Sequence, residues 1–431
     1  MLDLRLLREH PDAVERGLAV KGGAELVREI VAADAERRRL VKEADDLKAA
    51  RNRASEAIGQ ARRRGEDASA EQARVREIGD RIKGLDAAVA DIDERVRGWL
   101  LQLPNLPDPS APEGKGDQDN VEVRRWGEPR VFDFAPRPHE EVGETLGLLD
   151  MDRAAKIART RFAVLWGALA RLERALAQFM LDVQTREHGY TELWVPHLVS
   201  GETMLRTGQL PKFEEQLFKT VEADEGRTLY LIPTAEVSLT ALHGGEVLPE
   251  RTLPRRYVAF TPCYRREAGT YGKDMKGIFR NHQFDKVELV KVATPAQAHA
   301  ELETMVGDAE AILQRLGLPY RVVERCVGDL GFSAAKGYDI EVWLPGQGRY
   351  REISSCSSYD AFGGRRTDIR YKPEAGGKAE FCATLNGSGL AVGRTLIAVL
   401  ENYQEADGGV AVPAALRPYT GGLERLTPPS R

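Results

Sequence analysis

The sequence predicts an α+β protein in which an N-terminal antiparallel α-helical coiled-coil arm precedes a larger domain, whose antiparallel β-sheet is flanked by helices. Three observations predict this fold class. Apolar residues recur every three or four positions through residues 30–61 and again through 75–99, which is typical of two paired helices. Residues 103–120 are rich in Pro, Gly and Asp and therefore indicate a linker. Short β-like runs and helical stretches then follow without strict βαβ alternation, which favours an antiparallel sheet.

Length, charge and cysteine content exclude several classes of protein. At about 150 residues per domain, 431 residues predict two or three domains, and the net charge of −5 by itself gives no indication of nucleic acid. No apolar stretch approaches the ~18–20 residues of a membrane span, and the N-terminus lacks the apolar core of a secretory signal, so no membrane partner is expected. The four cysteines lack CxxC spacing, which argues against a disulfide framework or a thiolate zinc site and predicts a cytoplasmic location. They are Cys263, Cys326, Cys356 and Cys382.

The two heptad segments predict an arm with a basic far end. Gly65 and its polar neighbours interrupt the pattern, so we expect the helices to turn there and run antiparallel. Residues 48–83, around this turn, contain ten basic and six acidic residues, a local charge of +4. A basic end on a rigid lever suits a polyanion. Two alternatives to binding a polyanion remain at this point: the charges only keep the coiled coil soluble, or the coiled coil forms a dimer.

The linker predicts a division into an arm domain, residues 1–110, and a body, residues 111–431. In the body, residues 190–196 form a β-prone run that ends at a proline, and further β-like runs recur between 228 and 344. The expected helices are 153–187, 296–316 and 389–404. The chain has no P-loop and no GxGxxG in a βαβ context, so two common ways of holding ATP are absent.

The first polar cluster of the body spans residues 264–288. Tyr264-Arg265-Arg266-Glu267 follows a predicted strand and precedes a glycine-rich loop, and a second strand is expected from Ile278. A period of two places Arg280, Phe284 and Glu288 on one face of that strand. Arginine binds phosphate in a fork, an aromatic ring stacks on a base, and a carboxylate accepts from an amino group, so the cluster predicts a nucleotide site. The alternative is an exposed salt-bridge ladder.

Two more clusters follow. Glu352 and Ser355, within Glu-Ile-Ser-Ser, offer the oxygen ligands that Mg²⁺ prefers, although spacing alone does not decide for a metal. Residues 386–394 place small residues before a predicted helix and Arg394 on its first turns, where the guanidinium can bind phosphate. A plain packing turn between a strand and a helix is the alternative for this third cluster.

Taken in order, these segments resemble the three signatures of class II aminoacyl-tRNA synthetases. Residues 189–196 resemble the first signature, which forms the dimer interface in that family, and residues 264–288 resemble the second. Residues 387–394 resemble the third, with Ala391 where many members have glycine. Further segments are similar to bacterial-type seryl-tRNA synthetases: 207–213 (TGQLPKF), 234–236, 331–345, 352–366 and 384–395. With the arm and the linker, the resemblance covers essentially the whole chain.

The resemblance implies a serine–tRNA ligase. L-serine and MgATP form seryl-adenylate and pyrophosphate, and the 3′-terminal ribose hydroxyl of a serine tRNA, or of a selenocysteine tRNA where one is present, then accepts the seryl group. It also implies ATP as a substrate, Mg²⁺ but no zinc, and a homodimer through the first signature. The basic arm tip resembles the family's device for gripping the long variable arm of serine tRNAs.

The resemblance also assigns residues by position. The catalytic residues it implies are Arg265, Arg280 and Arg394. Those for L-serine are Thr234, Ala235, Glu236, Glu288 and Ser388. Those for ATP are Arg265, Arg266, Glu267, Asn281, Phe284, Glu352, Ile353, Ser354, Ser355 and Arg394. The metal ligands are Glu352 and Ser355, and the tRNA-binding residues are Arg51, Arg62, Arg63, Arg64, Arg74, Lys273 and Lys276.

Within these sets the implied roles are specific. Arg265 holds the α-phosphate and Arg394 the γ-phosphate, while Phe284 stacks on adenine and Glu267 accepts from its amino group. Thr234 and Glu236 face the serine ammonium, Arg280 its carboxylate, and Glu288 with Ser388 its hydroxyl. Two alternatives remain: a paralogue that loads serine or another small amino acid onto a carrier protein, and a non-catalytic binding protein. The long arm argues against the first, and the complete set of ATP-site residues argues against the second.

Overall fold

The computed structural model describes residues 1–221, 228–268 and 276–429. The chain divides into two compact units, Met1–Leu106 and Pro107–Arg431. None of the described helices is long and apolar enough to cross a membrane.

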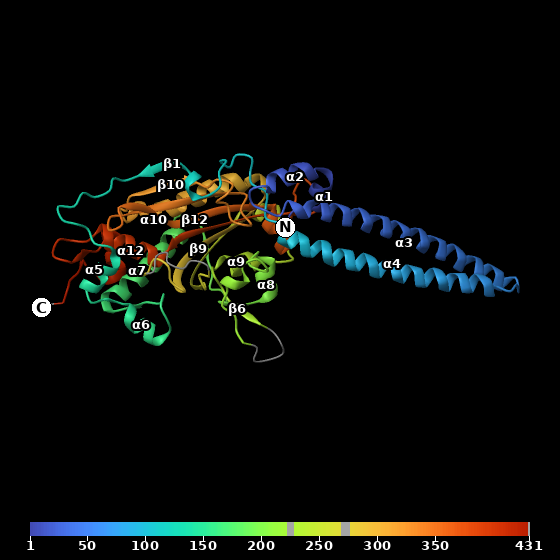
Figure 1. The fold of residues 1–431 in the computed structure, drawn as a ribbon, viewed down its shortest axis with the longest axis horizontal. Coiled ribbons are helices and arrows are strands. Elements are labelled where there is room, and N and C mark those ends of the chain that lie inside the picture. The colour runs from blue at the N-terminus through green and yellow to red at the C-terminus, as the bar shows by residue number, and fades with distance from the viewer. Residues whose placement is uncertain (222–227, 269–275, 430–431) are drawn as a thin grey trace. The chain divides into compact units, whose positions relative to one another are not determined.

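The smaller unit is helical. Its helices are α1 (Leu4–Glu9), α2 (Pro11–Leu18), α3 (Glu25–Arg63) and α4 (Ser69–Gln102). α3 and α4 lie side by side and antiparallel (Figure 1), joined by a short turn that contains Gly65 at φ +72°. Apolar residues of the heptad seam, among them Ile30, Leu40, Leu85 and Ile92, are buried between them. The antiparallel helical hairpin predicted from the heptads is therefore confirmed.

Ion pairs cross the hairpin beside the seam. The pairs are Arg37 with Asp93, Lys48 with Asp86 at 3.2 Å, and Arg81 with Glu43 at 2.9 Å. These exposed pairs each contribute little to stability, but they match charges along the two helices and so favour one register.

The larger unit contains an eight-stranded sheet in the order β1-β10-β11-β12-β15-β9-β8-β4. Its strands are β1 (Val121–Trp126), β4 (Thr191–Glu192), β8 (Arg255–Tyr264), β9 (Gln283–Ala293), β10 (Tyr320–Glu324), β11 (Lys336–Leu344), β12 (Arg349–Asp360) and β15 (Ala383–Ala391). Neighbours pair antiparallel throughout, except β4, which pairs parallel with β8 at the edge. The predicted antiparallel α+β architecture is confirmed.

The remaining elements surround this sheet. The helices are α5 (His139–Thr145), α6 (Met151–Ile157), α7 (Gly167–Arg186), α8 (Gly201–Arg206), α9 (Glu236–Ala241), α10 (Ala298–Arg315), α11 (Ala361–Thr367) and α12 (Val392–Asn402). The minor strands are β2 (Leu149–Asp150), β3 (Val164–Leu165), β5 (Leu198–Ser200), β6 (Leu229–Leu231), β7 (Val247–Pro249), β13 (Arg370–Lys372), β14 (Glu380–Phe381), β16 (Val410–Ala411) and β17 (Arg425–Leu426). Short 3₁₀ turns occupy Asp117–Asp119, Glu214–Gln216, Glu250–Thr252, Pro295–Gln297 and Ala414–Thr420.

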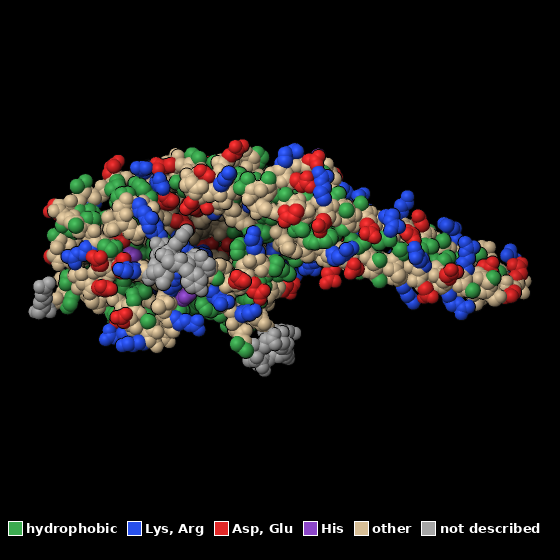
Figure 2. Space-filling model, viewed as in Figure 1, with side chains coloured by type: hydrophobic (Ala, Val, Ile, Leu, Met, Phe, Trp, Pro, Cys, Tyr) green, Lys and Arg blue, Asp and Glu red, His purple; other side chains and the backbone are tan. Residues whose placement is uncertain are grey.

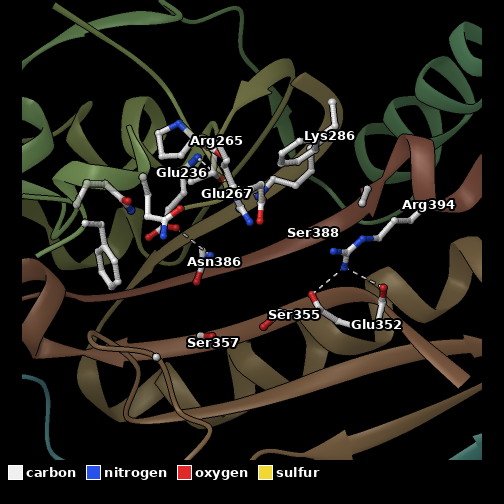
Figure 3. Close-up of a pocket in the computed structure, with 18 of the residues that line it drawn as sticks. Glu236, Arg265, Glu267, Lys286, Glu352, Ser355, Ser357, Asn386, Ser388 and Arg394 are labelled. Atoms are coloured by element: carbon white, nitrogen blue, oxygen red, sulfur yellow. Dashed lines mark hydrogen bonds and ion pairs between the residues drawn. The ribbon is translucent and has the colours of Figure 1, made fainter. Parts of the chain in front are cut away.

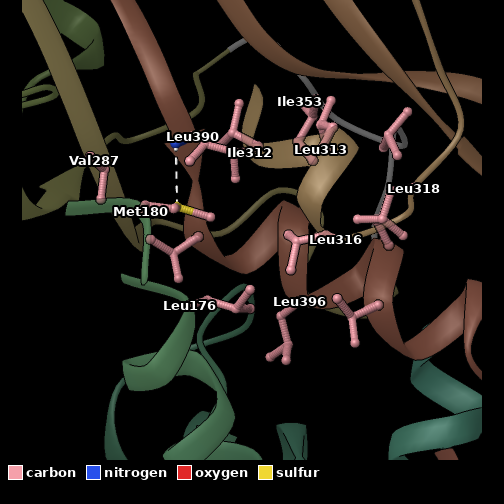
Figure 4. Packing of buried hydrophobic residues seen from close by; sticks show 14 of the residues in the cluster. Leu176, Met180, Val287, Ile312, Leu313, Leu316, Leu318, Ile353, Leu390 and Leu396 are labelled. Carbon is pink, nitrogen blue, oxygen red and sulfur yellow. Dashed lines mark hydrogen bonds between the residues drawn. The ribbon is translucent and has the colours of Figure 1, made fainter. Parts of the chain in front are cut away.

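The two faces of β9 divide the larger unit. On one face, Val287 and Leu289 are fully buried in the main hydrophobic core with side chains of α7, α10 and α12 (Figure 4). On the other face, Val290 packs with α9 residues in a smaller cluster, next to Lys286 and Glu288. Burial of the first face against three helices leaves the second face of the central strands to carry polar chemistry.

Three predicted elements differ from the structure. The helix predicted over 389–404 begins only at Val392, because residues 389–391 belong to β15. The helix predicted over 153–187 is divided into α6 and α7, because Val164–Leu165 pair with Leu149–Asp150 as a two-stranded ribbon and Gly167 at φ +48° begins a new helix. The strand predicted from Ile278 begins instead at Gln283. The Ile278 N–H donates to a histidine ring rather than to a neighbouring strand, and Gly277 at φ +70° turns the chain there.

Candidate active site

A cavity of about 590 Å³ lies in the larger unit on the polar face of β9, β12 and β15, a volume typical of small-molecule sites. Figure 2 shows this face hollowed, with acidic side chains at the edge of the hollow. Twelve of the residues assigned by position line the cavity: Thr234, Glu236, Arg265, Glu267, Arg280, Asn281, Phe284, Glu352, Ile353, Ser355, Ser388 and Arg394. Segments far apart in the sequence thus contribute to one site.

Arg265 and Glu267 reach the cavity from the turn that follows β8. β8 ends at Tyr264, so strand alternation does not place them, and Glu267 has a positive φ of +48°. The Arg265 guanidinium lies 5.2 Å from the centre of the Phe284 ring, and its Nε donates to the Pro233 carbonyl at 3.3 Å. A cation held against an aromatic face in this way suits a planar base beside a phosphate.

Arg280 pairs with Glu267 rather than with the polar cluster at Glu236. Its Nη1 donates to Glu267 Oε2 at 2.8 Å. The expected period of two from Ile278 does not apply to Arg280, since it precedes β9, but it reaches the cavity all the same.

Glu352 and Ser355 reach the same side of β12 because the strand carries a bulge. Ser354 pairs with Ile340 and Glu352 pairs with Glu341, so Ile353 has no opposite partner on β11. In a regular strand, residues three apart point to opposite faces, and one extra residue reverses that relation. Both side chains therefore line the cavity (Figure 3).

Arg394 extends toward Glu352 from the first turn of α12 (Figure 3). Its Nη1 lies 3.2 Å from Glu352 Oε1 and donates to the Glu352 carbonyl at 2.9 Å. The positive charge of Arg394 lowers the pKa of the Glu352 carboxyl, which keeps it ionised at neutral pH. Asp339 stands opposite Ser355 on β11, and burial raises its pKa to about 7.

A second polar cluster joins α9, β9 and β15. Asn386 Nδ2 donates to Glu236 Oε2 at 3.1 Å and to Glu288 Oε1 at 3.3 Å (Figure 3 draws the first). Lys286 Nζ lies 2.7 Å from Glu288 Oε2 and donates to Thr234 Oγ1 at 2.8 Å. Burial, with the Glu288 charge as the second cause, raises the pKa of Glu236 to about 7. The cluster holds two buried carboxylates but only one lysine, so it favours an added cation such as an ammonium group.

Four of the residues assigned to ATP or to serine do not line the cavity. Ala235 is fully buried in an apolar cluster, and Ser354 points away to donate to the Ser388 carbonyl at 2.6 Å. The Arg266 side chain is exposed, while its backbone N–H donates to the Gln216 carbonyl. Glu288 is fully buried behind Lys286, Asn386 and Ser388, which do line the cavity.

The residues assigned to tRNA lie in both units. Arg51, Arg62 and Arg63 lie on α3, Arg64 in the turn and Arg74 on α4, and all except Arg51 are exposed. Arg64 pairs with Glu66 at 3.0 Å, whereas no ion pair in the described part of the chain engages the other four. Lys276 is exposed, and Lys273 lies outside the described residues.

Several lining residues had no assigned role in the sequence. Lys286 is on the same strand face as Phe284, so the alternation of side chains along the strand predicts that it points toward the site. No local pattern predicts its two partners, Glu288 and Thr234. Asn386 lies inside a segment noted for its glycines. No local sequence pattern predicts that Arg325 and Phe279 line the cavity. Arg325 follows β10 and Phe279 precedes β9, and only the order of strands in the sheet brings these segments to one site.

The side-chain oxygens of Glu352 and Ser355 suit a hard cation such as Mg²⁺, whose other ligands are waters and substrate phosphates. Glu352 and Ser355 face the cavity, and Asp339 Oδ1 behind them is buried with no hydrogen-bond partner among the described residues. In the same part of the chain, no three His, Cys, Asp or Glu side chains gather to hold a metal by themselves. Mg²⁺ usually keeps waters and substrate phosphates as ligands, so two or three protein oxygens fit it.

Comparisons with known proteins identify the class. Residues 218–403 match the family model of the tRNA synthetase class II core domain (G, H, P, S and T), and residues 1–107 match that of the Seryl-tRNA synthetase N-terminal domain. The antiparallel sheet, the cavity and these matches define a class II aminoacyl-tRNA synthetase.

Full-length relatives then identify the family. The Serine--tRNA ligase of Nitratidesulfovibrio vulgaris (strain DSM 19637 / Miyazaki F) is 55% identical over 99% of this chain and 100% of its own length. The chain belongs to the seryl-tRNA synthetase family. The crystal structure of seryl-tRNA synthetase from Pyrococcus horikoshii complexed with ATP covers 100% of both chains at a TM-score of 0.93 and 38% identity. That of the cytoplasmic Serine-tRNA ligase from Naegleria fowleri in complex with AMP covers 100% of this chain and 99% of its own, at a TM-score of 0.90 and 29% identity.

Proposed function

We propose that the chain is a serine–tRNA ligase, which activates L-serine with ATP in the cavity and transfers the seryl group to tRNA. One observation carries the proposal. Within a single cavity, a nucleotide-type cluster (Arg265, Phe284, Glu352 and Arg394) lies beside an acidic cluster suited to an ammonium group (Glu236, with Glu288 behind it). The complexes of relatives of this family, one with ATP and one with AMP, support the first half.

In the first step, the serine carboxylate attacks the α-phosphorus of ATP, and the bond to pyrophosphate breaks. Arg265 is proposed to neutralise the α-phosphate. The Phe284 ring, over which the Arg265 guanidinium lies, is proposed to stack on adenine. Arg394 is proposed to bind the γ-phosphate, exchanging part of its contact with Glu352. Because reactants already held in line need no protein nucleophile, positioning and charge neutralisation supply the catalysis.

Recognition of serine is assigned to the cluster around Asn386. Glu236 and Thr234 are proposed to receive the ammonium group, and Ser388 the hydroxyl. Glu288 is proposed to contribute to serine recognition indirectly: its buried carboxylate contacts Lys286 and Asn386, and these two residues line the pocket. A pocket built to bond a hydroxyl rejects alanine, since its own polar groups would remain unpaired. Arg280, paired with Glu267, is kept as the candidate for the serine carboxylate.

Mg²⁺ is proposed to accompany ATP. Glu352 and Ser355 would hold it, and Asp339 lies directly across from Ser355. When bound, the ion supplies positive charge to the phosphate oxygens.

The arm is proposed to bind the tRNA. Its exposed arginines near the turn, among them Arg62, Arg63 and Arg74, present positive charge to phosphates, and Figure 2 draws both signs of charge along the arm. The match of residues 1–107 to the Seryl-tRNA synthetase N-terminal domain supports this role and does not favour a paralogue that loads a carrier protein. Selenocysteine tRNA is a further proposed substrate where a cell contains it.

A homodimer is proposed through the surface around β4. Trp194 is 89% exposed beside this edge strand, with Leu198 and Phe260 also exposed. Exposed apolar side chains at a sheet edge favour an interface. We also propose a cytoplasmic location, because the four cysteines are free.

ATP–pyrophosphate exchange with serine, threonine, alanine and glycine tests the proposal. We expect exchange with serine, at a kcat/KM at least about tenfold above that for alanine and glycine, since these lack a hydroxyl and leave the pocket's polar groups unpaired. Charging of serine tRNA tests the second step. Exchange without charging would favour a carrier-loading paralogue, and neither activity would favour a non-catalytic protein.

A further inference from the structure

A buried histidine lies behind the nucleotide half of the cavity. His139, the first residue of α5, is 1% exposed. Its Nδ1 lies 3.2 Å from Glu401 Oε1 and also 3.2 Å from Glu140 Oε2, and its backbone N–H donates to the Glu401 oxygen at 3.1 Å. Glu401, fully buried on α12, also accepts from the Gly346 N–H at 2.9 Å. Since two backbone N–H groups donate to this carboxylate, it acts as an acceptor toward the ring, and Nδ1 carries the proton.

The other ring nitrogen holds the backbone that enters the cavity. The Ile278 N–H donates to His139 Nε2 at 3.0 Å. A backbone N–H cannot accept a hydrogen bond, so Nε2 is unprotonated and the imidazole is neutral. Gly277 lies directly against the ring, and a Cβ at that position would overlap Nε2. The chain therefore passes His139 with no room for a side chain.

This backbone contact determines where the Phe279 ring lies. Ile278 and Phe279 both line the cavity, and the Phe279 ring has the Arg394 guanidinium 4.5 Å and the Arg351 guanidinium 3.8 Å from its centre. Arg394 and Glu401 are seven residues apart on α12 and so lie on one face of that helix. α12 thus contacts the segment twice: through Glu401 and His139, and through Arg394 on the ring.

We infer that His139 is a positioning residue for ATP: with Glu401 it fixes the Ile278 backbone, and thereby the Phe279 ring on which Arg394 lies. The inference rests on the proposed function, in which Arg394 binds the γ-phosphate of ATP. His139 itself does not line the cavity and touches no substrate. It acts through Phe279, so its loss should affect the nucleotide and spare the serine cluster around Asn386.

The test compares His139→Leu with His139→Gln. Leucine removes the acceptor, while the glutamine Oε1 offers one near the position of Nε2. We expect His139→Leu to raise the Kd for ATP, measured by calorimetry, by about three- to tenfold, the effect of losing one hydrogen bond. His139→Gln should stay within about twofold, and the KM for serine should change in neither. The matched control is His243→Leu, a histidine that is also buried, at 8% exposed, and bonds Tyr257 and Glu246 away from the cavity.

Two further variants keep the inference open to refutation if His139→Leu does not fold. Gly277→Ala places a methyl group against the His139 ring and pushes the same backbone away from it, so it should reproduce the weaker ATP binding. In a Phe279→Leu background, removal of the His139 acceptor should cause no additional loss, because the ring it positions is gone. Equal losses for ATP and serine, no rescue by glutamine, or additive effects with Phe279→Leu would each overturn the inference. Failure of the proposed function is seen separately, as absent serine-dependent exchange in the unaltered protein that still binds ATP.

Discussion

Replacing Glu236 with glutamine should stabilise the ligand-free protein and weaken serine binding. Glu236 is 5% exposed, and burial and the nearby Glu288 raise its pKa to about 7 from an ordinary 4.5. This difference corresponds to ~3 kcal/mol, the free energy that the folded state loses when Glu236 is ionised without a cation partner. Because the folded-state pKa is raised, the stability contributed by the protonated form is fully present below about pH 4.5. It is lost as the pH rises through about 7.

The expected gain therefore depends on pH. At pH 8, Glu236→Gln should increase the free energy of unfolding by about 1–3 kcal/mol, since glutamine can still accept from Asn386. At pH 4 the gain should be close to zero, because Glu236 is then protonated in both states. Thermal and urea unfolding at the two pH values measure this difference. Glu310→Gln is the matched control: it removes the charge of a buried glutamate from its ion pair with the half-exposed Arg124 (2.6 Å) and should destabilise the protein at pH 8.

The same substitution should cost serine binding. A charged hydrogen bond contributes about 1.5–3 kcal/mol, so the KM for serine should rise roughly 10- to 150-fold while the KM for ATP stays within about twofold. In the unaltered enzyme, kcat/KM for serine should fall as the pH drops below about 7, and in Glu236→Gln this fall should disappear. An unchanged serine KM, or a destabilisation at pH 8 as large as that of the control, would refute the assignment.

Three other variants, one of them a double substitution, test the nucleotide site, the metal site and the arm. Phe284→Ala should raise the KM for ATP about tenfold, the scale of base–aromatic stacking, with an unchanged KM for serine; loss of serine binding would contradict its role. Glu352→Gln should shift the Mg²⁺ dependence of pyrophosphate exchange to roughly tenfold higher concentration, and an unshifted titration would remove Glu352 as a ligand. Arg62→Glu together with Arg63→Glu should weaken tRNA charging at least about tenfold, more strongly at low salt, without changing exchange; charging at the normal rate would exclude the arm tip from tRNA contact.

Local pattern was sufficient for the arm and for the class of sheet. Heptads in 30–61 and 75–99 predicted α3 and α4, because a 3.5-residue repeat of apolar side chains requires a partner helix. The β-like runs of the body predicted antiparallel pairing, as β8 and β9 confirm. Pattern was insufficient within 153–187, where helical spacing hid the β2–β3 ribbon. There, a tertiary pairing with an earlier segment overrides local propensity.

The amino-acid sequence by itself determined which chemical groups are available: forked guanidiniums, an aromatic plane, carboxylates and hydroxyls in three ordered segments. Only the tertiary structure decided which of them meet. The bulge at Ile353 brings Glu352 and Ser355 to one side of β12, and the pairing of β15 with β9 brings Asn386 between Glu236 and Glu288. The physical reason is that side-chain period is set by neighbouring residues, whereas strand register, burial and the resulting pKa of Glu236 depend on segments about 100 to 150 residues away.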